Sequence, residues 1–291
     1  MNMKISINTK FMHNTKPVFE KLRAIGFDGL DYSIGAENSV FKEPRKVWVD
    51  HFSQTRAALD ESGLKAFQSH ATFPTNIDSQ PRFTDKSLEQ MKKEIEAAAI
   101  LGSPYIVIHP INFASGEFRR EEEIKANLDM FTKLEPVLRE HDVKLGIENM
   151  WVYDMLRLRY APTSCAITED MIFYVDTLNG TLNSDRFVAC LDTGHIFMHA
   201  LSPANAARKL GKRLKIMHVQ DNFGTHDSHN APGQGEIDWK DYAAALKEIG
   251  YDGVFNMELN YAKEFAFSEE AGFTYMKYAY LAAKSIAEEL D

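Results

Sequence analysis

The stretch Ile25-Gly26-Phe27-Asp28-Gly29 returns near the other end of the chain as Ile249-Gly250-Tyr251-Asp252-Gly253. Each copy follows an amphipathic stretch and precedes an apolar run, so each one marks the passage from a helix into a strand. A glycine directly after a helix can take the left-handed backbone conformation that ends it. The two copies therefore indicate a fold built from repeated strand–helix units.

Short β-rich runs alternate with longer amphipathic stretches along the whole chain. Thr15 begins one expected helix and Gly26 ends it, while Thr84 begins another that ends at Gly102. This alternation is typical of βαβ units around a parallel sheet. Eight such units over 291 residues predict an α/β fold, a parallel eight-stranded (β/α)₈ TIM barrel that forms a single domain over residues 1–291. The expected strands are 4–9, 28–33, 64–70, 104–109, 143–149, 187–192, 214–220 and 253–259.

Composition excludes several classes of protein. A formal net charge of −9 disfavours nucleic acid and anionic membranes as partners, because both require a concentrated positive surface. The chain has no 18-residue apolar run, and residues 1–10 lack the apolar core that a signal peptide would have. Cys165 and Cys190 are too few for a disulfide framework. We therefore expect a cytoplasmic protein without a membrane or nucleic-acid partner, and the sequence leaves homo-oligomerisation open.

Polar side chains occur at or near the carboxyl-terminal ends of six expected strands. Steps of two along each strand place them on the inner face of the barrel, together with small or apolar residues such as Gly146 and Cys190. Barrel enzymes carry their catalytic groups at this end. The long irregular segments 111–119, 150–167 and 221–237, each directly after a strand, would surround it. The six residues are His70, His109, Glu148, Asp192, His218 and Glu258.

Three of these residues are carboxylates, which would repel one another and take up protons unless a cation lay among them. The set of Glu148, Asp192, His218 and Glu258 is rich in oxygen and has one imidazole. It suits one divalent metal ion as cofactor: Mn²⁺, Mg²⁺, Co²⁺ or Zn²⁺. The alternative is that each is a hydrogen-bonded polar residue that closes the barrel mouth. Four such residues on successive strands favour the metal.

Four segments around these residues resemble the xylose isomerase-like barrel superfamily of sugar phosphate isomerases and epimerases. A fifth, Pro232-Gly233-Gln234-Gly235-Glu236-Ile237-Asp238-Trp239, shares the resemblance. It implies a metal-dependent enzyme with a small carbohydrate substrate, and it implies Glu148, Asp192, His218 and Glu258 as ligands, with the two glutamates doubling as catalytic acid and base. The four segments are Ile147-Glu148-Asn149-Met150, Leu191-Asp192-Thr193-Gly194-His195, Met217-His218-Val219-Gln220-Asp221 and Met257-Glu258.

The chemistry expected from such a site is isomerisation or epimerisation. A metal-bound α-hydroxy carbonyl compound would lose a C–H proton to one glutamate and pass through a cis-enediolate. The other glutamate would return a proton, and either Glu148 or Glu258 could act first. An inosose-type dehydratase on the same site is the nearest alternative, because it shares the first proton abstraction.

Further residues are expected to contact substrate. His195 resembles the substrate-contacting histidine of the ketose 3-epimerase branch, and Asp154 falls where that branch has a second acid. His70 and His109 would also face the substrate from the rim. The branch carries an arginine soon after the metal-binding histidine, but Asn222 to His226 contains none. This departure bears on which substrate is bound.

The loop residues Asp227 and His229 form a second candidate metal site, with solvated loop polarity as the alternative. They also belong to a competing resemblance, to the endonuclease IV family of metal-dependent repair enzymes. Cleavage of abasic DNA is therefore an alternative to the sugar isomerase function, and it belongs to another class of enzyme. The ligand types of that family can be matched by His70, His109, Glu148, Asp192, His195, His218, Asp227, His229 and Glu258.

Aromatic residues in the loops after the strands could keep water away from a carbanion-like intermediate, with core packing as the alternative. The stretch 151–166, which contains two arginines, is expected to form a lid or a subunit contact. The aromatic residues are Phe11, Phe73, Phe113, Trp151 and Tyr153.

Overall fold

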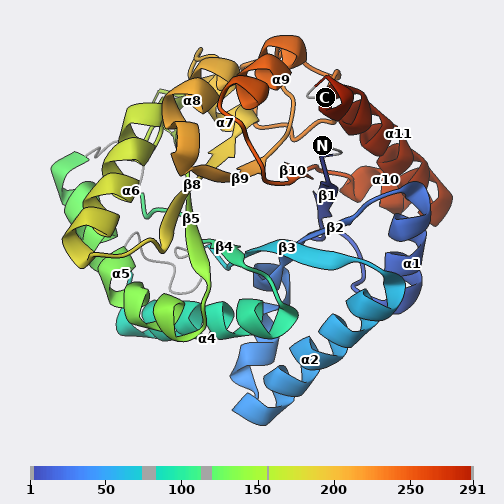
Figure 1. Ribbon diagram of the computed structural model, residues 1–291, viewed down its shortest axis with the longest axis horizontal. Coiled ribbons are helices and arrows are strands. Elements are labelled where there is room, and N and C mark those ends of the chain that lie inside the picture. The colour runs from blue at the N-terminus through green and yellow to red at the C-terminus, as the bar shows by residue number, and fades with distance from the viewer. Residues whose placement is uncertain (1–2, 74–82, 113–119, 156, 290–291) are drawn as a thin grey trace.

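Eight parallel strands surround one axis in a computed structural model that describes residues 3–73, 83–112, 120–155 and 157–289. Each strand pairs with its neighbour in the order β10-β1-β2-β3-β4-β5-β8-β9 (Figure 1). The predicted (β/α)₈ barrel is therefore confirmed. The strands are β1 Ile5–Asn8, β2 Gly29–Ser33, β3 Lys65–His70, β4 Tyr105–Val107, β5 Lys144–Glu148, β8 Phe187–Asp192, β9 Leu214–His218 and β10 Phe255–Met257.

The ring closes between β9 and β10, just beyond the end of β9. Val219 forms a parallel bridge with Met257, and its N–H donates to the carbonyl of Asn256 at 2.8 Å. The N–H of Glu258 in turn donates to the carbonyl of Val219 at 3.0 Å. Closure thus fixes the backbone of Glu258 against the strand that carries His218.

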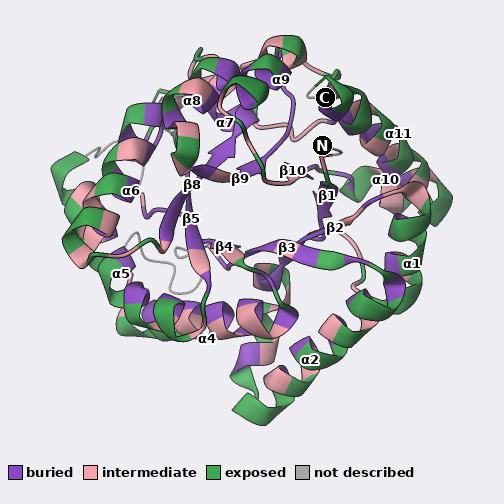
Figure 2. Cartoon of the chain, in the orientation of Figure 1, coloured by how far each residue is buried: buried purple, intermediate pink, exposed green. Residues whose placement is uncertain are grey.

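Helices cover the outside of the barrel, with their inner sides buried and their outer sides exposed (Figure 2). The α-helices are α1 Lys16–Ile25, α2 Arg45–Ser62, α4 Asp85–Leu101, α5 Arg120–Glu140, α6 Thr168–Leu182, α7 Thr193–Met198, α8 Pro203–Leu210, α9 Trp239–Glu248, α10 Ala262–Phe267 and α11 Glu269–Glu288. Two 3₁₀ segments, η1 Ile34–Lys42 and η2 Gly211–Arg213, join them. Among the described residues, no helix combines the length and the apolar character needed to cross a bilayer.

The helix ends follow the sequence signals. Thr84 caps α4, where its hydroxyl accepts from the N–H of Ser87 at 3.2 Å, and Gly102 ends the helix in the left-handed conformation. Gly26 ends α1 with φ of 129°, and a Cβ there would lie 2.4 Å from the ring of Tyr280. A side chain at Gly26 would clash with Tyr280, and the left-handed backbone at Gly102 favours glycine, so both helices end where the sequence predicts.

The barrel interior is lined by small and apolar side chains. Val107, Cys190 and Ile216 form a cluster of their own inside the ring. A Cβ on Gly146 would lie 2.4 Å from Cδ1 of Ile216, so the interior has room only for glycine there. This packing confirms the predicted inner register. Both cysteines are free and buried.

One loop expectation is wrong. The segment 150–167 contains an antiparallel hairpin, in which β6 Trp151–Asp154 pairs with β7 Arg159–Pro162. Its turn is held by Asp154, whose carboxylate accepts from the N–H of Arg157 at 3.0 Å. Several strands are also shorter than expected, and β4 and β10 end before His109 and Glu258, which lie just beyond their strands.

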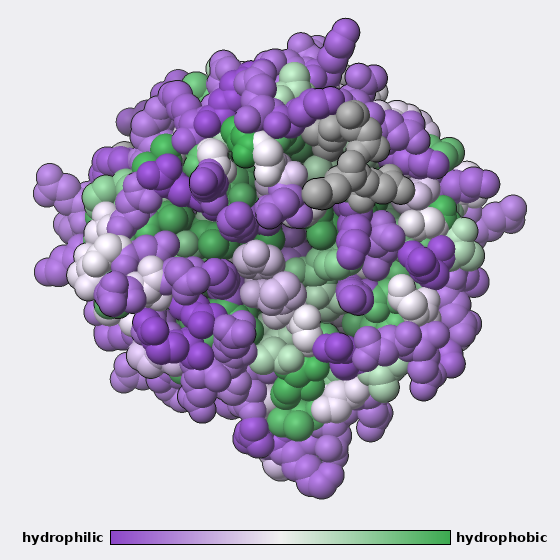
Figure 3. Space-filling model, in the orientation of Figure 1, coloured by the Kyte–Doolittle hydropathy of each residue, from purple (hydrophilic) through white to green (hydrophobic). Residues whose placement is uncertain are grey.

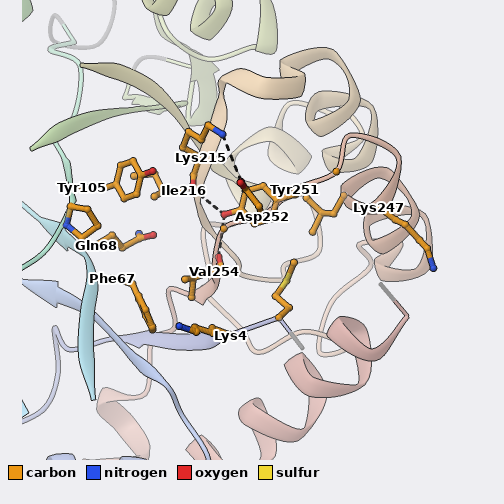
Figure 4. A pocket seen from close by; sticks show the side chains of 15 residues that line it. Lys4, Phe67, Gln68, Tyr105, Lys215, Ile216, Lys247, Tyr251, Asp252 and Val254 are labelled. Carbon is orange, nitrogen blue, oxygen red and sulfur yellow. Dashed lines mark hydrogen bonds and ion pairs between the residues drawn. The ribbon is translucent and has the colours of Figure 1, made fainter. Parts of the chain in front are cut away.

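A cavity of about 570 Å³ opens at the amino-terminal end of the barrel. Its lining includes Lys4, Lys215, Phe67 and Tyr105 (Figure 4). Lys215 Nζ lies 3.7 Å from Asp252, and Lys4 Nζ lies 5.3 Å from the centre of the Phe67 ring. Figure 3 shows a face whose centre gathers apolar and weakly polar residues within a hydrophilic rim.

Candidate metal centre

The four predicted ligands meet at the carboxyl-terminal end of the barrel. Nδ1 of His218 lies 3.0 Å from Oε1 of Glu148 and 3.3 Å from Oε2 of Glu258. One ligand atom from each of Glu148, Asp192, His218 and Glu258 falls within a group whose members all lie within 4.8 Å of one another. The strand-end pattern thus brings these side chains to one point.

Asp31 on β2 orients His218 from the opposite side of its ring. Its Oδ2 lies 3.1 Å from Nε2 of His218 and accepts from Nε2 of Gln68 at 3.1 Å and Nδ2 of Asn256 at 3.3 Å. Because Asp31 binds the Nε2 proton, Nδ1 is left with its lone pair toward the cluster. The sequence reasoning missed Asp31, although a lone acid on the inner register of an apolar strand was a usable signal.

Asn149 and Gln220 fix Asp192. The carbonyl of Asn149 Oδ1 accepts from the N–H of Asp192 at 2.8 Å, and its Nδ2 donates to the Asp192 carbonyl at 3.0 Å. Oδ1 of Asp192 accepts from the N–H of His195 at 2.7 Å and from Nε2 of Gln220 at 3.3 Å. Asp192 therefore caps α7 with one oxygen and keeps the other for the cluster.

Two buried oxygens in the cluster have no hydrogen-bond partner among the described residues, namely Oε2 of Glu148 and Oδ2 of Asp192. Nε2 of His109 lies 2.8 Å from that Glu148 oxygen, but the geometry is not that of a hydrogen bond. Burial raises the pKa of Asp192 to about 7, where His195 opposes the shift and Glu148 adds to it. Buried, unsatisfied carboxylate oxygens are the groups that a divalent cation would satisfy, so the residues fit a metal.

His70 and His109 extend the cluster on one side. Their Nε2 atoms lie 3.0 Å apart, and both approach Glu148 Oε2, at 3.7 Å for His70 and 2.8 Å for His109. Nδ1 of His70 bonds the carbonyl of Ala71 at 2.8 Å, which directs Nε2 inward. These two histidines and Glu148 form a second group of potential ligands.

His195, Asp227 and His229 form a third group on the other side. Oδ2 of Asp227 lies 3.3 Å from Nε2 of His195 and 3.1 Å from Nε2 of His229. The Nδ1 atoms of the two histidines bond the carbonyls of Asn149 at 2.8 Å and Glu258 at 2.9 Å. Asp227 and His229 are therefore part of an organised cluster rather than of a solvated loop surface.

Asp221 organises the loop that carries this third group. Its Oδ1 accepts from the N–H of Asn222 at 3.0 Å and of Ile237 at 3.2 Å, and its Oδ2 accepts from the N–H of Gly233 and from the Trp239 indole at 2.8 and 2.9 Å. The aspartate of the His-x-x-Asp motif thus has a structural task. Gly233 has φ of 85°, a left-handed conformation that favours glycine.

The β6–β7 hairpin contacts the third group. Nε1 of Trp151 donates to Asp227 Oδ2 at 3.1 Å, and its ring lies edge-on to His195 at 6.1 Å between centroids. Asp154 is buried and forms an ion pair with Arg157 at 2.6 Å. Arg157, which follows closely in the sequence, is thus its partner within the hairpin turn. Tyr153 is partly exposed on the hairpin, and Phe113 lies outside the described residues.

Residues 19–277 match the sequence profile of the xylose isomerase-like TIM barrel family. The chain belongs to this family. The match spans most of the chain and includes every member of the three ligand groups.

Two relatives of this chain are an epimerase and an isomerase. D-psicose 3-epimerase of Enterocloster bolteae is 25% identical over 84% of this chain and 76% of its own. Inosose isomerase of Bacillus subtilis is 26% identical over 59% of each chain. The crystal structure of the IOLI protein with a bound zinc atom superposes with a TM-score of 0.72 at 21% identity, covering 99% of this chain and 98% of that one. Endonuclease 4 of Thermus thermophilus is 24% identical over 70% of each chain.

Proposed function

We propose that this protein is a divalent-metal-dependent isomerase or epimerase of a small carbohydrate, with Glu148 and Glu258 as acid and base. The observation that carries the proposal is the convergence of three carboxylates and one imidazole within 4.8 Å, with two carboxylate oxygens left unsatisfied. The family and the sugar and cyclitol enzymes among its relatives support the same chemistry.

The metal supplies one thing when bound: it polarises the substrate carbonyl and makes the neighbouring C–H more acidic. The glutamates do the rest. One removes the proton from the carbon next to the carbonyl, and the C–H electron pair becomes the C=C bond of an enediolate. The other glutamate then delivers a proton to the same carbon, which inverts it, or to the former carbonyl carbon, in which case the hydroxyl proton passes from one enediolate oxygen to the other and the carbonyl moves. Both carboxylates approach Nδ1 of His218, Glu148 to 3.0 Å and Glu258 to 3.3 Å, so both are within reach of a substrate held at this point.

The two glutamates differ in their access to the outside of the barrel. Glu148 is fully buried, whereas the side chain of Glu258 retains 14% of its exposure and lines a cavity that opens outward. Glu258 is therefore the carboxylate in direct reach of a substrate entering from that cavity. We assign contacts to substrate oxygens to His195, His70 and His109, whose rings border the cluster, and leave Asp154 to the hairpin turn.

Hydrogen exchange tests this function directly. Purified, metal-loaded protein in deuterated water is incubated with a panel of ketoses and keto-cyclitols, and the products are analysed by mass and NMR spectroscopy. We expect deuterium at one carbon with no loss of water. Loss of water with a conjugated, ultraviolet-absorbing product would establish the dehydratase alternative. Absence of exchange with every member of the panel would count against both.

A second candidate function is cleavage of abasic DNA. The observation in its favour is that three ligand groups lie side by side. Two of them share Glu148, and the third is joined to Asp192 through Gln220, whose Nε2 donates to Asp227 at 2.6 Å and to Asp192 at 3.3 Å. Such an array can hold three ions. The test is incubation of zinc-loaded protein with an abasic duplex. Strand cleavage that Asp227→Asn abolishes would replace the sugar proposal, and an intact duplex would remove this one.

A further inference from the structure

A cavity of about 200 Å³ leads from Glu258 and His70 toward the loops that follow β1 and β2. The catalytic cluster forms one end of this cavity. Lys10, Ser33 and Asn38 contribute polar side chains to its lining away from the cluster, and Phe73 contributes an aromatic wall. A substrate held at the cluster would place its remote substituent here.

Lys10 is a cation without a carboxylate partner among the described residues. Its Nζ lies 5.5 Å from the centre of the Phe11 ring and 5.6 Å from that of the Phe73 ring, which hold it by cation–π attraction. Other lysines do pair with acids, as Lys16 does with Glu61 and Lys133 with Asp129, and the chain has nine more acids than Lys and Arg residues. A lysine kept between two rings and away from acids is available to a ligand.

Ser33 is a buried hydroxyl on the same wall, 7% exposed. It shares the inner register of β2 with Asp31, and Ser33 pairs with His70 across the sheet. Its N–H donates to Thr9 at 3.0 Å, but its Oγ has no hydrogen-bond partner among the described residues. A hydroxyl that lines a cavity in this state is free to donate to an incoming acceptor.

Close chain packing shapes the floor next to these groups. A Cβ on Gly35 would lie 2.8 Å from the carbonyl oxygen of Ala71 and from the backbone of Thr72. Gly35 follows Ser33 at the start of η1, where backbone N–H groups lack helical acceptors. The cavity wall opposite the acidic cluster therefore offers one cation, one free hydroxyl and backbone donors, and no described carboxylate other than Glu258 lines the space.

We propose that the substrate carries an anionic group at the end remote from the reacting carbons, and that Lys10 and Ser33 bind it. The group is a carboxylate or a phosphate, so the substrate is a sugar acid or a sugar phosphate rather than a neutral ketose. The proposal rests on the function proposed above and narrows it to an anionic substrate class.

The experiment compares three substrates of equal chain length in the exchange assay: a neutral ketose, its terminal phosphate and the corresponding keto-sugar acid. Wild type is expected to favour one of the anionic substrates, and that arm identifies the group. Lys10→Met should lower kcat/KM for this substrate about ten- to a hundredfold, mainly through KM, because a charged hydrogen bond to substrate is lost. The same variant should leave kcat/KM for the neutral ketose unchanged.

Controls separate failure of this proposal from failure of the function. Lys247→Met, at the opposite end of the barrel, should leave all three substrates unaffected. Ser33→Ala should weaken the anionic substrate alone and by a smaller factor. If wild type turns over the neutral ketose as well as the anionic substrates, or if Lys10→Met affects all three equally, the anion site is wrong while the isomerase stands. If none of the three shows exchange, the function itself fails.

Discussion

The two ends of this barrel differ in open volume and in buried charge. The amino-terminal end has the larger cavity, whose charged lining residues are Lys4, Lys215, Lys247 and Asp252, and Lys215 lies 3.7 Å from Asp252. The carboxyl-terminal end holds buried histidines and carboxylates, and two of the carboxylate oxygens have no hydrogen-bond partner in the part of the chain that the structure describes. The comparison teaches that unsatisfied buried carboxylates, rather than the largest open volume, mark the proposed active site.

Substitutions at the two ends should differ most in catalysis. Glu148→Gln and Glu258→Gln each remove a proton-transfer group, and we expect exchange rates to fall by about 10²- to 10⁴-fold. Lys215→Gln, in the lining of the larger cavity, should retain the wild-type rate. Measured exchange with the best substrate from the panel checks both. Full activity in both glutamine variants would show that the two-carboxylate chemistry is wrong.

A divalent metal ion should raise the free energy of unfolding by binding at the carboxyl-terminal end of the barrel. A ligand that binds the folded state alone adds about 2.7 kcal/mol to the free energy of unfolding at a hundredfold excess over its Kd. Thermal unfolding of chelator-treated protein, repeated with added Mn²⁺, Co²⁺ or Zn²⁺, should show this gain in wild type and in Lys215→Gln. The gain should disappear in Asp192→Asn. Equal stabilisation of that variant would place the ion elsewhere.

Asp31 offers a sharper test, because it lies below the cluster and inside the ring. Its contact with Nε2 of His218 holds the ring with Nδ1 toward the other ligands. Asp31→Asn should lower metal affinity by about ten- to a hundredfold, as loss of such a supporting contact does in other metal sites. Calorimetric titration measures the affinity. Unchanged affinity, with an unchanged fold by circular dichroism, would mean that Asp31 only fills the barrel.

A change in the pH dependence of stability is expected at the support of the rim. Glu94 on α4 is buried and accepts from the hydroxyl and the N–H of Thr72, at 2.5 and 3.2 Å. Burial raises its pKa to about 7, against the hydrogen bonds from Thr72 and Gln90. The folded state then binds more protons than the unfolded chain between about pH 4.5 and 7, so stability falls as the pH rises through that window, by at most about 1.4 kcal/mol per unit.

Glu94→Gln should therefore flatten the dependence of unfolding free energy on pH in this window, measured by denaturant titration at several pH values. Glu89→Gln, on an exposed position of the same helix, is the matched control and should keep the wild-type slope. A slope that survives in Glu94→Gln would assign the pH dependence to other groups.

Sequence reasoning located the barrel and the central cluster for a physical reason. Parallel strands end at one rim, so Glu148, Asp192 and His218 at successive strand ends had to converge, whatever the loops did. It missed what depends on side chains meeting across the ring, such as Asp31 beneath His218. It also placed the wrong structure on 150–167, because a hairpin held by Asp154 and Arg157 depends on contacts that no strand period reveals.

The third ligand group, which contains Asp227 and His229, could be predicted only in part. Asp227 and His229 could be named as a candidate site from their spacing, but only the folded loop shows His229 bonded to the carbonyl of Glu258 on one side and to Asp227 on the other. The fixing of this loop by Asp221 was not visible in the sequence, since its four donors come from residues 222–239.

Metal content tests the central claim most directly. Wild type, Lys215→Gln and His218→Gln are stripped with chelator, incubated with an equimolar mixture of Mn²⁺, Mg²⁺, Co²⁺ and Zn²⁺, dialysed and analysed for bound metal. We predict at least one ion per chain in wild type and Lys215→Gln, and a loss of about one ion per chain in His218→Gln. Wild type that retains no metal, or a His218→Gln variant that retains as much as wild type, would contradict the account.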